Sequence, residues 1–409
     1  MSTTNPSRKS ALDWRMVVLA GCCIAVISFG PRSAMGVFQM PVLTSFGWGS
    51  AAFSVALAIQ NLLWGTFQPF AGALADRYGS LRVLMVGALF YAAGLILMAW
   101  SSTPLAFDLT AGALIGIGLS GSSFNLVLGA FGKLVPPEKQ PMAFGLGSAA
   151  GSFGQFLFSP LAGGLVAAFG WQTTVILFGC VILAIIPLSL AVASPPAPVA
   201  TEAHGGQSSL AALRAAMSDR SYVLLTLGFY TCGFQLAFVT VHFQKYVIES
   251  GLPASTGYWA FALVGMFNVV GSLSAGWLSQ RMPRRYILSA IYLARSASTV
   301  LFILLPPSTA GVYLFGMITG LLWLSTVPPT NSIIVQLFGA RHFAMLSGFA
   351  FFSHQVGGFC GVLIGGYGRG GFGSYTIAWA ISIALGVFSA LVNLPIVERP
   401  ARGTIEATA

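Results

Sequence analysis

The chain has 409 residues, of which 56% are hydrophobic and only 7% are charged. Soluble globular domains carry about 25% charged residues, so this composition excludes an ordinary soluble enzyme or binding module. A membrane-spanning helix needs about 20 apolar residues. The chain therefore has room for roughly a dozen such helices.

The formal net charge is +10, which in a soluble protein would suggest a nucleic-acid partner. The Lys and Arg residues form no single basic patch, however, and membrane topology explains them better. The five cysteines lie in apolar stretches and lack the paired spacing of a metal site. We expect no nucleic-acid partner, no bound metal and no cofactor.

Long apolar runs bounded by charges or by Pro and Gly predict twelve membrane helices. Those in the first part of the chain are expected at 16–44, 51–74, 83–101, 104–131, 141–168 and 171–194. Those in the second part are expected at 221–247, 255–279, 286–305, 310–336, 343–367 and 373–396.

A polar interval separates these two sets of six helices. We expect a linker over 195–220, within which 209–220 is a short amphipathic helix at the membrane interface. The linker divides the chain into two six-helix halves, 1–194 and 221–409.

The distribution of basic residues predicts the orientation. With the N-terminus in the cytoplasm, most Lys and Arg residues lie on the cytoplasmic side, while Lys245 and Arg369 lie outside. Arg32 and Arg295 fall inside predicted helices. We expect a multi-pass protein with both termini in the cytoplasm.

The two halves repeat at an offset of about 203 residues. Residues 72–79 match 276–283, and Gly30, Arg32 and Gln39 align with Gly233, Gln235 and His242. Like-oriented repeats of this kind generate a pseudo-two-fold axis along the membrane normal, which is typical of transporters.

The segment 72–82, GALADRYGSLR, resembles the loop between helices 2 and 3 of the major facilitator superfamily. A weaker copy lies at 276–285, and PLAGG at 160–164 is similar to a helix-5 signature of that family. The resemblance implies an all-α, twelve-helix fold with two pseudo-symmetric halves that alternate in rocker-switch fashion. It also implies a cytoplasmic gate, for which the candidates are Gly72, Asp76, Arg77, Arg82, Arg281 and Arg285.

Within that superfamily the chain is most similar to bacterial monocarboxylate-porter-type members. This resemblance rests on FGW at 46–48, CGFQ at 232–235 and SHQ at 353–355. It implies a small organic anion as substrate and a location in the inner membrane. Members of this group often carry a substrate-binding arginine in helix 8, but this chain has none between Pro253 and Gln280.

Arg32 lies midway along the first predicted helix, and a charge at that depth costs several kcal/mol. All nine acidic residues lie in loops or at helix ends, so the pattern offers Arg32 no carboxylate partner. Because guanidinium pairs bidentately with carboxylate, the pattern predicts an anionic ligand here. The alternative is that Arg32 bonds helix carbonyls or reaches toward the membrane interface.

Several polar residues in the predicted helices are further candidates for contact with the substrate. Gln39 shares a helix face with Arg32, and the repeat places Gln235 opposite Arg32 across the pseudo-symmetry axis. The other predicted contacts are Asn125, Gln155 and Asn331. Hydrogen bonds between helices would explain such residues equally well.

His354 is expected both as a substrate contact and as a candidate for proton coupling, because imidazole titrates near physiological pH. A hydrogen-bonded core histidine is the alternative. Arg295 lies on a peripheral helix, where a structural role is favoured.

These observations predict a secondary active transporter for a mono- or dicarboxylate, with protons as a candidate co-substrate. The chain lacks the paired titratable groups that an enzyme would need. The alternative is a drug or metabolite exporter that exchanges protons. We expect a monomer in the lipid bilayer.

Overall fold

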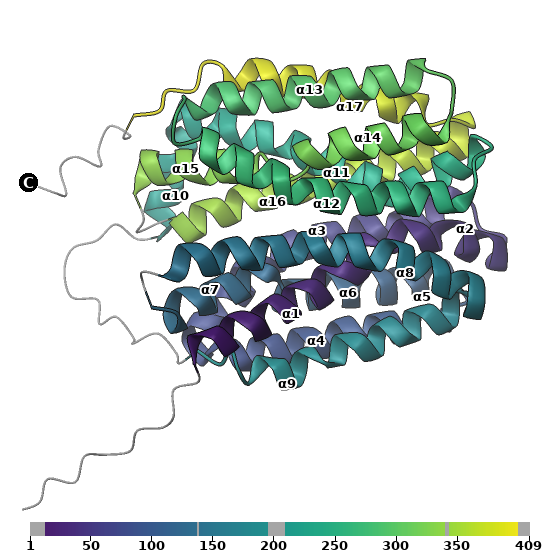
Figure 1. Ribbon diagram of the computed structural model, residues 1–409, viewed down its shortest axis with the longest axis horizontal. Coiled ribbons are helices and arrows are strands. Elements are labelled where there is room, and N and C mark those ends of the chain that lie inside the picture. The colour runs from purple at the N-terminus through teal and green to yellow at the C-terminus, as the bar shows by residue number, and fades with distance from the viewer. Residues whose placement is uncertain (1–12, 137–138, 195–208, 340–342, 400–409) are drawn as a thin grey trace, which may run out of the picture.

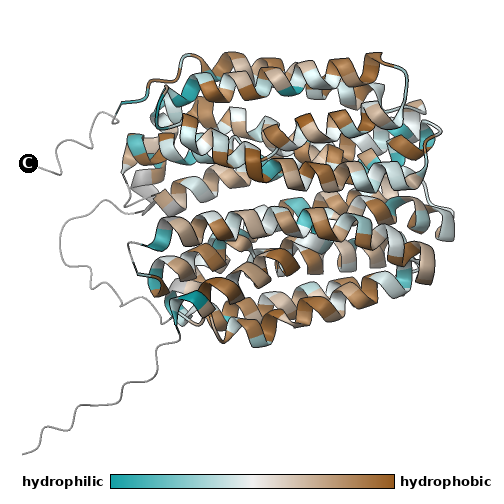
Figure 2. Cartoon of the chain, viewed as in Figure 1, coloured by the Kyte–Doolittle hydropathy of each residue, from teal (hydrophilic) through white to brown (hydrophobic). Residues whose placement is uncertain are grey.

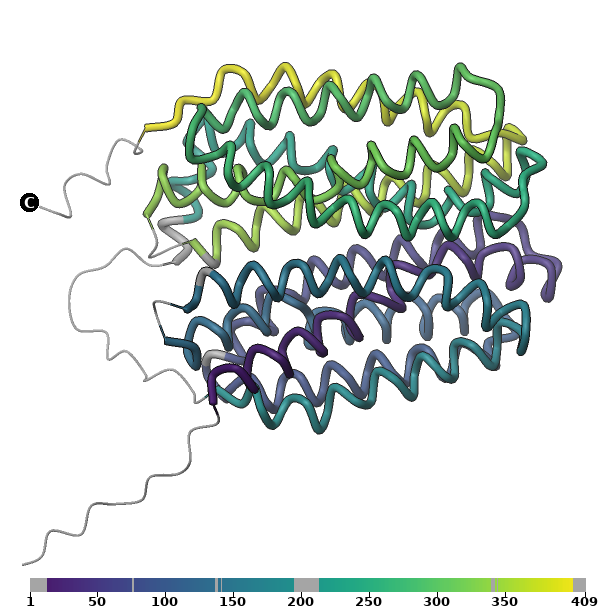
Figure 3. Tube along the Cα trace, in the orientation of Figure 1, coloured from purple at the N-terminus to yellow at the C-terminus, as the bar shows by residue number. Residues whose placement is uncertain are grey.

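A computed structural model describes residues 13–136, 139–194, 209–339 and 343–399, and every regular element within these ranges is a helix. The helices run side by side along one direction and form two bundles that lie against each other (Figure 1). The same two bundles are seen along the Cα trace (Figure 3).

The first bundle holds the helices up to residue 189. They are α1 (Trp14–Ser33), α2 (Met35–Phe46), α3 (Ser50–Tyr78), α4 (Ser80–Met98), α5 (Pro104–Phe107), η1 (Asp108–Leu114), α6 (Ile115–Gly121), α7 (Phe124–Leu134), α8 (Gln140–Leu183) and α9 (Ile185–Ser189).

The second bundle follows the short helix α10 (Ser209–Ser218). It holds α11 (Arg220–Glu249), α12 (Ala254–Leu278), α13 (Arg284–Leu304), α14 (Thr309–Leu322), α15 (Val327–Phe338), α16 (Phe343–Phe372) and α17 (Thr376–Asn393).

Eleven segments of the described chain are long and apolar enough to cross a membrane. One of them, built on α8, contains two of the predicted helices. The 44 residues of α8 would extend about 66 Å as a straight helix. A bilayer core is about 30 Å thick. Gly170 resolves the mismatch, since its φ of 80° and ψ of 166° interrupt the helix between the predicted spans 141–168 and 171–194.

Each bundle has its own hydrophobic core. One core is built mainly from residues 17–192, and the other from residues 216–396. Hydrophobic residues also cover the lengths of the helices, while hydrophilic ones gather at their two ends (Figure 2). This is the distribution expected when lipid surrounds the helices.

Two names distinguish the ends of the molecule. The α10 end is the one at which α10 lies, α1 begins and α17 ends, and the far end is the opposite one, at which α2 ends (Figure 1).

Candidate functional site

The first membrane-spanning segment is interrupted at Ala34, between α1 and α2. Pro31 lacks a backbone N–H and so weakens the helix at this point. The Ser33 hydroxyl donates to the Gly30 carbonyl at 2.7 Å. Arg32 lies in the last turn of α1, where the helix dipole favours a positive charge.

The Arg32 side chain is 9% exposed and is held by α3. Its Nη2 donates to Asn61 Oδ1 at 2.6 Å, and Asn61 Nδ2 donates in turn to the Leu57 carbonyl at 2.7 Å. The guanidinium carbon lies 5.0 Å from the centroid of the Trp64 ring, which is a cation–π contact. Nε has no hydrogen-bond partner among the residues that the structure describes. The ion pairs of the described chain do not include Arg32.

The polar face of α3 continues from Trp64 to a second helix interruption. Trp64 Nε1 donates to Gln68 Oε1 at 3.0 Å, and Gln68 Nε2 donates to Ser123 Oγ at 2.9 Å. Ser123 directly precedes α7. The N-terminus of a half-helix carries partial positive charge, so this end of α7 adds to the positive character of the region.

Gln39 lies between the bundles and is fully buried. Its Nε2 is 3.3 Å from Nδ1 of His242 on α11, and His242 Nε2 is 2.9 Å from the Val362 carbonyl on α16. Gln39 and His242 are equivalent positions of the repeat. The structure thus places Gln39 in a contact between the two bundles.

Gln155 is also fully buried, and within the described part of the chain neither atom of its amide has a hydrogen-bond partner. Its neighbours Ser152 and Ser159 bond to α12 of the second bundle: Asn268 Nδ2 donates to Ser152 Oγ at 2.9 Å, and Ser159 Oγ donates to the Tyr258 carbonyl at 3.0 Å. The polar stripe of α8 therefore faces α12.

The two predicted asparagines lie on the half-helices α7 and α15. Asn125 is exposed on the first turn of α7. Asn331 is partly buried on α15 and accepts from Ser347 Oγ at 3.4 Å.

His354 is partly buried on α16 among aromatic rings. The rings of Phe229 and Phe351 lie 5.0 and 5.7 Å from it, and Gln355 Oε1 is 3.2 Å from its Nδ1. These contacts do not test the proton-coupling role of His354, which stays a prediction.

The expectation that Gln235 faces Arg32 is wrong. Gln235 Nε2 donates to the Ser382 carbonyl at 2.9 Å, and its Oε1 accepts from Arg295 Nη1 at 3.4 Å. Both partners belong to the second bundle. The buried guanidinium of Arg295 draws the amide away from the first bundle.

Arg295 braces the interruption between α14 and α15. It donates from Nε to the Leu322 carbonyl at 3.0 Å, and from Nη2 to the Leu322 and Trp323 carbonyls. Nη1 lies 3.4 Å from Cys232 Sγ. Buried carbonyls inside a membrane require such partners, which agrees with the structural role that the sequence favours for Arg295.

The predicted gate residues lie at the α10 end. The Arg77 and Arg281 guanidinium groups lie over the rings of their neighbours Tyr78 and Trp277. Arg82 is exposed, and a Cβ at Gly72 would meet no heavy atom of the described residues within 4 Å.

A contact within the second bundle anchors Arg285, another of these gate candidates. Its backbone N donates to Glu398 Oε1 at 2.8 Å. The side chain of Asp76 lies outside the described residues. Gating by these residues stays a prediction.

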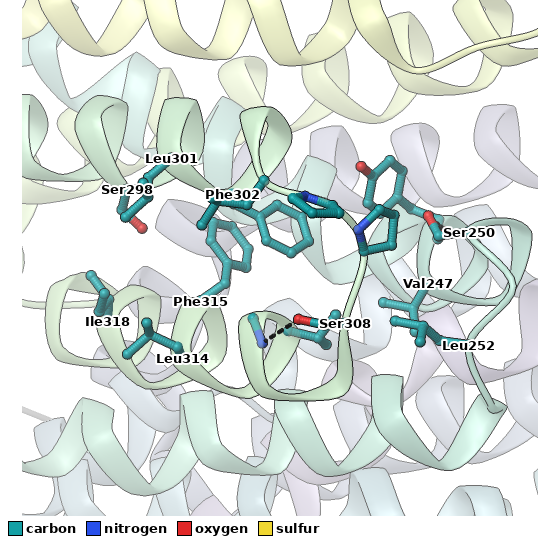
Figure 4. Close-up of a pocket in the computed structure, with 16 residues that line it drawn as sticks. Val247, Ser250, Leu252, Ser298, Leu301, Phe302, Ser308, Leu314, Phe315 and Ile318 are labelled. Carbon is teal, nitrogen blue, oxygen red and sulfur yellow. Dashed lines mark hydrogen bonds between the residues drawn. The ribbon is translucent and has the colours of Figure 1, made fainter.

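A hollow at the far end of the second bundle has a different character from the surroundings of Arg32 (Figure 4). Leu301, Phe302, Phe315 and Ile318 point into it, and none of the described residues that line it is charged. Its polar groups include Ser308, whose hydroxyl accepts from the Gly311 N–H at 3.1 Å. This lining is ill suited to an anion.

The family model of the Major Facilitator Superfamily matches residues 20–362. The chain belongs to this superfamily. The prediction of an all-α membrane fold of the major facilitator type is thereby confirmed, and the chain is a multi-pass membrane transporter rather than an enzyme.

Relatives in sequence are named as transporters. The chain is 25% identical to an uncharacterised MFS-type transporter, YcxA of Bacillus subtilis, over 89% of this chain and 90% of that protein. It is 24% identical to human monocarboxylate transporter 11 over 94% of this chain and 83% of that protein. Its 28% identity to rat monocarboxylate transporter 3 covers 65% of this chain and 55% of that protein. The resemblance to monocarboxylate-porter-type members is therefore confirmed.

Solved structures show the same fold. A bacterial homologue of the human lysosomal transporter Spinster, inward-facing and occupied, superposes with a TM-score of 0.75 over 95% of this chain and 97% of that chain, at 13% identity. A point mutant of the nucleoside transporter NupG also gives 0.75, over 93% of this chain and 99% of that chain, at 12% identity.

Asn61 and Asn268, two fully or almost fully buried amides on equivalent helices, are not among the predicted site residues. An asparagine inside a long apolar run is itself a signal, because an unpaired amide is costly in lipid. The signal did not reveal the partner of either residue.

Proposed function

We propose that this transporter is a secondary active transporter of a small organic anion, either a mono- or a dicarboxylate. The observation that carries the proposal is Arg32, a buried guanidinium that Asn61 and Trp64 hold in position without neutralising it. Among the described residues, Nε is left without a partner. A buried charge of this kind favours a ligand carboxylate, and relatives named monocarboxylate transporters support this choice.

We further propose that transport occurs by alternating access. The halves 1–194 and 221–409, joined by the linker 195–220, would rock about a site near the midplane. The hydrogen bonds described between the bundles, such as Gln39 with His242, lie toward the far end or the middle. This pattern supports a state that is closed at the far end.

The excess of basic residues at the α10 end supports a cytoplasmic location for this end and for both termini. The inner membrane is then the expected location, and a monomer the expected assembly. Protons are the proposed coupling ion, with His354 as their carrier.

A transport assay in liposomes tests the proposal. Purified protein is reconstituted, and uptake of radiolabelled mono- and dicarboxylates is followed with and without a pH gradient. We expect uptake by the wild type and less than about a tenth of that rate for Arg32→Gln, the loss expected when a charged hydrogen-bond partner of the ligand is removed. Arg214→Gln, which removes an exposed charge on α10, is the matched control and is expected to transport normally.

Two results would contradict the proposal. One is normal carboxylate uptake by Arg32→Gln. The other is an absence of carboxylate transport together with proton-driven efflux of cationic or neutral amphiphiles, which would favour the exporter.

A further inference from the structure

Asn268 connects three structural elements at one buried point. It lies on α12 and is fully buried. Its Nδ2 donates to Ser152 Oγ on α8, across the interface between the bundles, at 2.9 Å. Its Oδ1 accepts from the backbone N–H of Leu324 at 3.0 Å and from Ser272 Oγ at 3.1 Å.

Leu324 lies in the interruption between α14 and α15. Its N–H is among the backbone groups that a broken helix leaves without a helical partner. Inside a membrane such a group needs a substitute acceptor, and Asn268 supplies it. Arg295 supplies the donors for the carbonyls of Leu322 and Trp323, so both sides of the interruption are bonded by side chains.

The backbones of α12 and α14 also pack tightly beside this point. A Cβ at Gly271 would collide with the Leu321 carbonyl, and one at Gly320 would lie 2.6 Å from the Val264 carbonyl. Because glycines allow this close approach, α12 packs directly against the last turn of α14, beside the interruption.

We propose that Asn268 is a positioning residue that couples the interface between α8 and α12 to the half-helix α15. One amide holds the first bundle through its NH₂ group and holds Leu324 through its oxygen. When the bundles separate at Ser152, the amide loses one of the two side-chain bonds that fix its orientation, and the bond from the Leu324 N–H to its oxygen weakens.

The consequence concerns Asn331, which α15 carries. In this inference, which rests on the alternating access proposed above, rocking of the bundles moves α15 and changes the geometry of the site. The position of Asn331 thus depends on which side of the transporter is open.

Hydrogen exchange of the Leu324 amide tests the inference with the full-length protein in nanodiscs. Ser152→Ala removes the bond across the interface but no group that touches Leu324. If the coupling exists, the amide should exchange about fivefold faster than in the wild type, since one hydrogen bond contributes about 1 kcal/mol. Asn268→Ala should give a larger increase, and Ser152→Ala keeps the test valid if that variant does not fold.

Ser159→Ala is the matched control, because it removes a hydrogen bond from the same face of α8 to the Tyr258 carbonyl of α12 without involving Asn268. It should leave exchange at Leu324 unchanged. Wild-type exchange in Ser152→Ala would overturn the inference, as would equal acceleration by both variants, which would indicate a general loosening.

The readout needs no substrate. A failure of the proposed anion transport would appear as an absence of carboxylate binding by the wild type. It would leave the exchange comparison interpretable.

Discussion

Arg32 is a charge that the protein holds in place and leaves available. Asn61 Oδ1 accepts a hydrogen bond from Nη2 of Arg32, yet an amide oxygen carries no full charge that would compete with an anion. A carboxylate in the same place would neutralise the guanidinium. We therefore infer that Asn61 positions the guanidinium of Arg32 and leaves its charge available to a ligand.

Substitution of Asn61 tests that role. Asn61→Asp should abolish carboxylate binding, because the new carboxylate pairs with Arg32 and excludes the ligand. Asn61→Ala should weaken binding only about tenfold, as expected for the loss of one charge-assisted hydrogen bond. Isothermal titration calorimetry with a carboxylate that the wild type binds measures the affinity of each variant. Equal affinities for the two variants would contradict this role of Asn61.

Arg295 has the opposite role, because its donors are occupied by backbone carbonyls. Arg295→Gln should lower the melting temperature, since each buried carbonyl left unpaired costs about 1–3 kcal/mol. Carboxylate affinity at a temperature where the variant is folded should stay within about twofold of wild type. A large loss of affinity without a loss of thermal stability would mean that Arg295 binds the substrate.

His354 carries the prediction about protons. If it is the proton carrier, His354→Asn should abolish the stimulation of carboxylate uptake by acidic pH. The measurement is the pH profile of uptake into liposomes, with His242→Asn compared in parallel. A profile identical to that of the wild type would reject this role.

The sequence predicts which residues are unusual better than it predicts their partners. The sequence singles out Arg32 because a charge inside an apolar helix is costly. It also shows that no acidic residue lies in the middle of a predicted helix. Gln235 was assigned the wrong partner, since the repeat aligns backbones but does not indicate that Arg295 reaches the same amide. Rotamers and contacts between distant helices decide such pairs.

Helix interruptions are the features that the hydropathy pattern conceals. The sequence predicts continuous helices at 16–44, 104–131 and 310–336, while the structure interrupts each of them. Conversely, the sequence predicts the boundary between 141–168 and 171–194, and the non-helical backbone angles of Gly170 form it. An apolar run predicts that a segment crosses the membrane. It does not predict a helix interruption, because side chains from other helices stabilise the interruption.

Gly36 tests the contact between α2 and α11. A Cβ there would collide with the Thr240 carbonyl of the second bundle. Gly36→Ala should therefore push the far ends apart. Spin labels on Thr44→Cys and Ala254→Cys, with the native cysteines replaced by serine, should show a longer distance.

Gly164→Ala is the control for this experiment, because a Cβ at Gly164 would meet no heavy atom of the described chain within 4 Å. It should leave the distance between the labels unchanged. An unchanged distance in Gly36→Ala would mean that the α2–α11 contact does not hold the far end closed.

At the scale of the whole molecule, polar contacts between the bundles extend from the middle to the far end. There Lys245 of the second bundle donates to Ser50 of the first. A hydrogen bond contributes only about 0.5–1.5 kcal/mol, so these bonds hold the closed state by many small contributions. Such a state can be reversed by the binding energy of a small ligand.

Ligand-induced thermal stabilisation tests the central claim, that Arg32 anchors an anionic substrate. A ligand that binds the native state raises the melting temperature by mass action. We expect certain small carboxylates to raise it for the wild-type protein in detergent, and the same compounds to have no effect on Arg32→Gln. Stabilisation of both proteins by the same carboxylates, or stabilisation only by cations and neutral amphiphiles, would contradict the account.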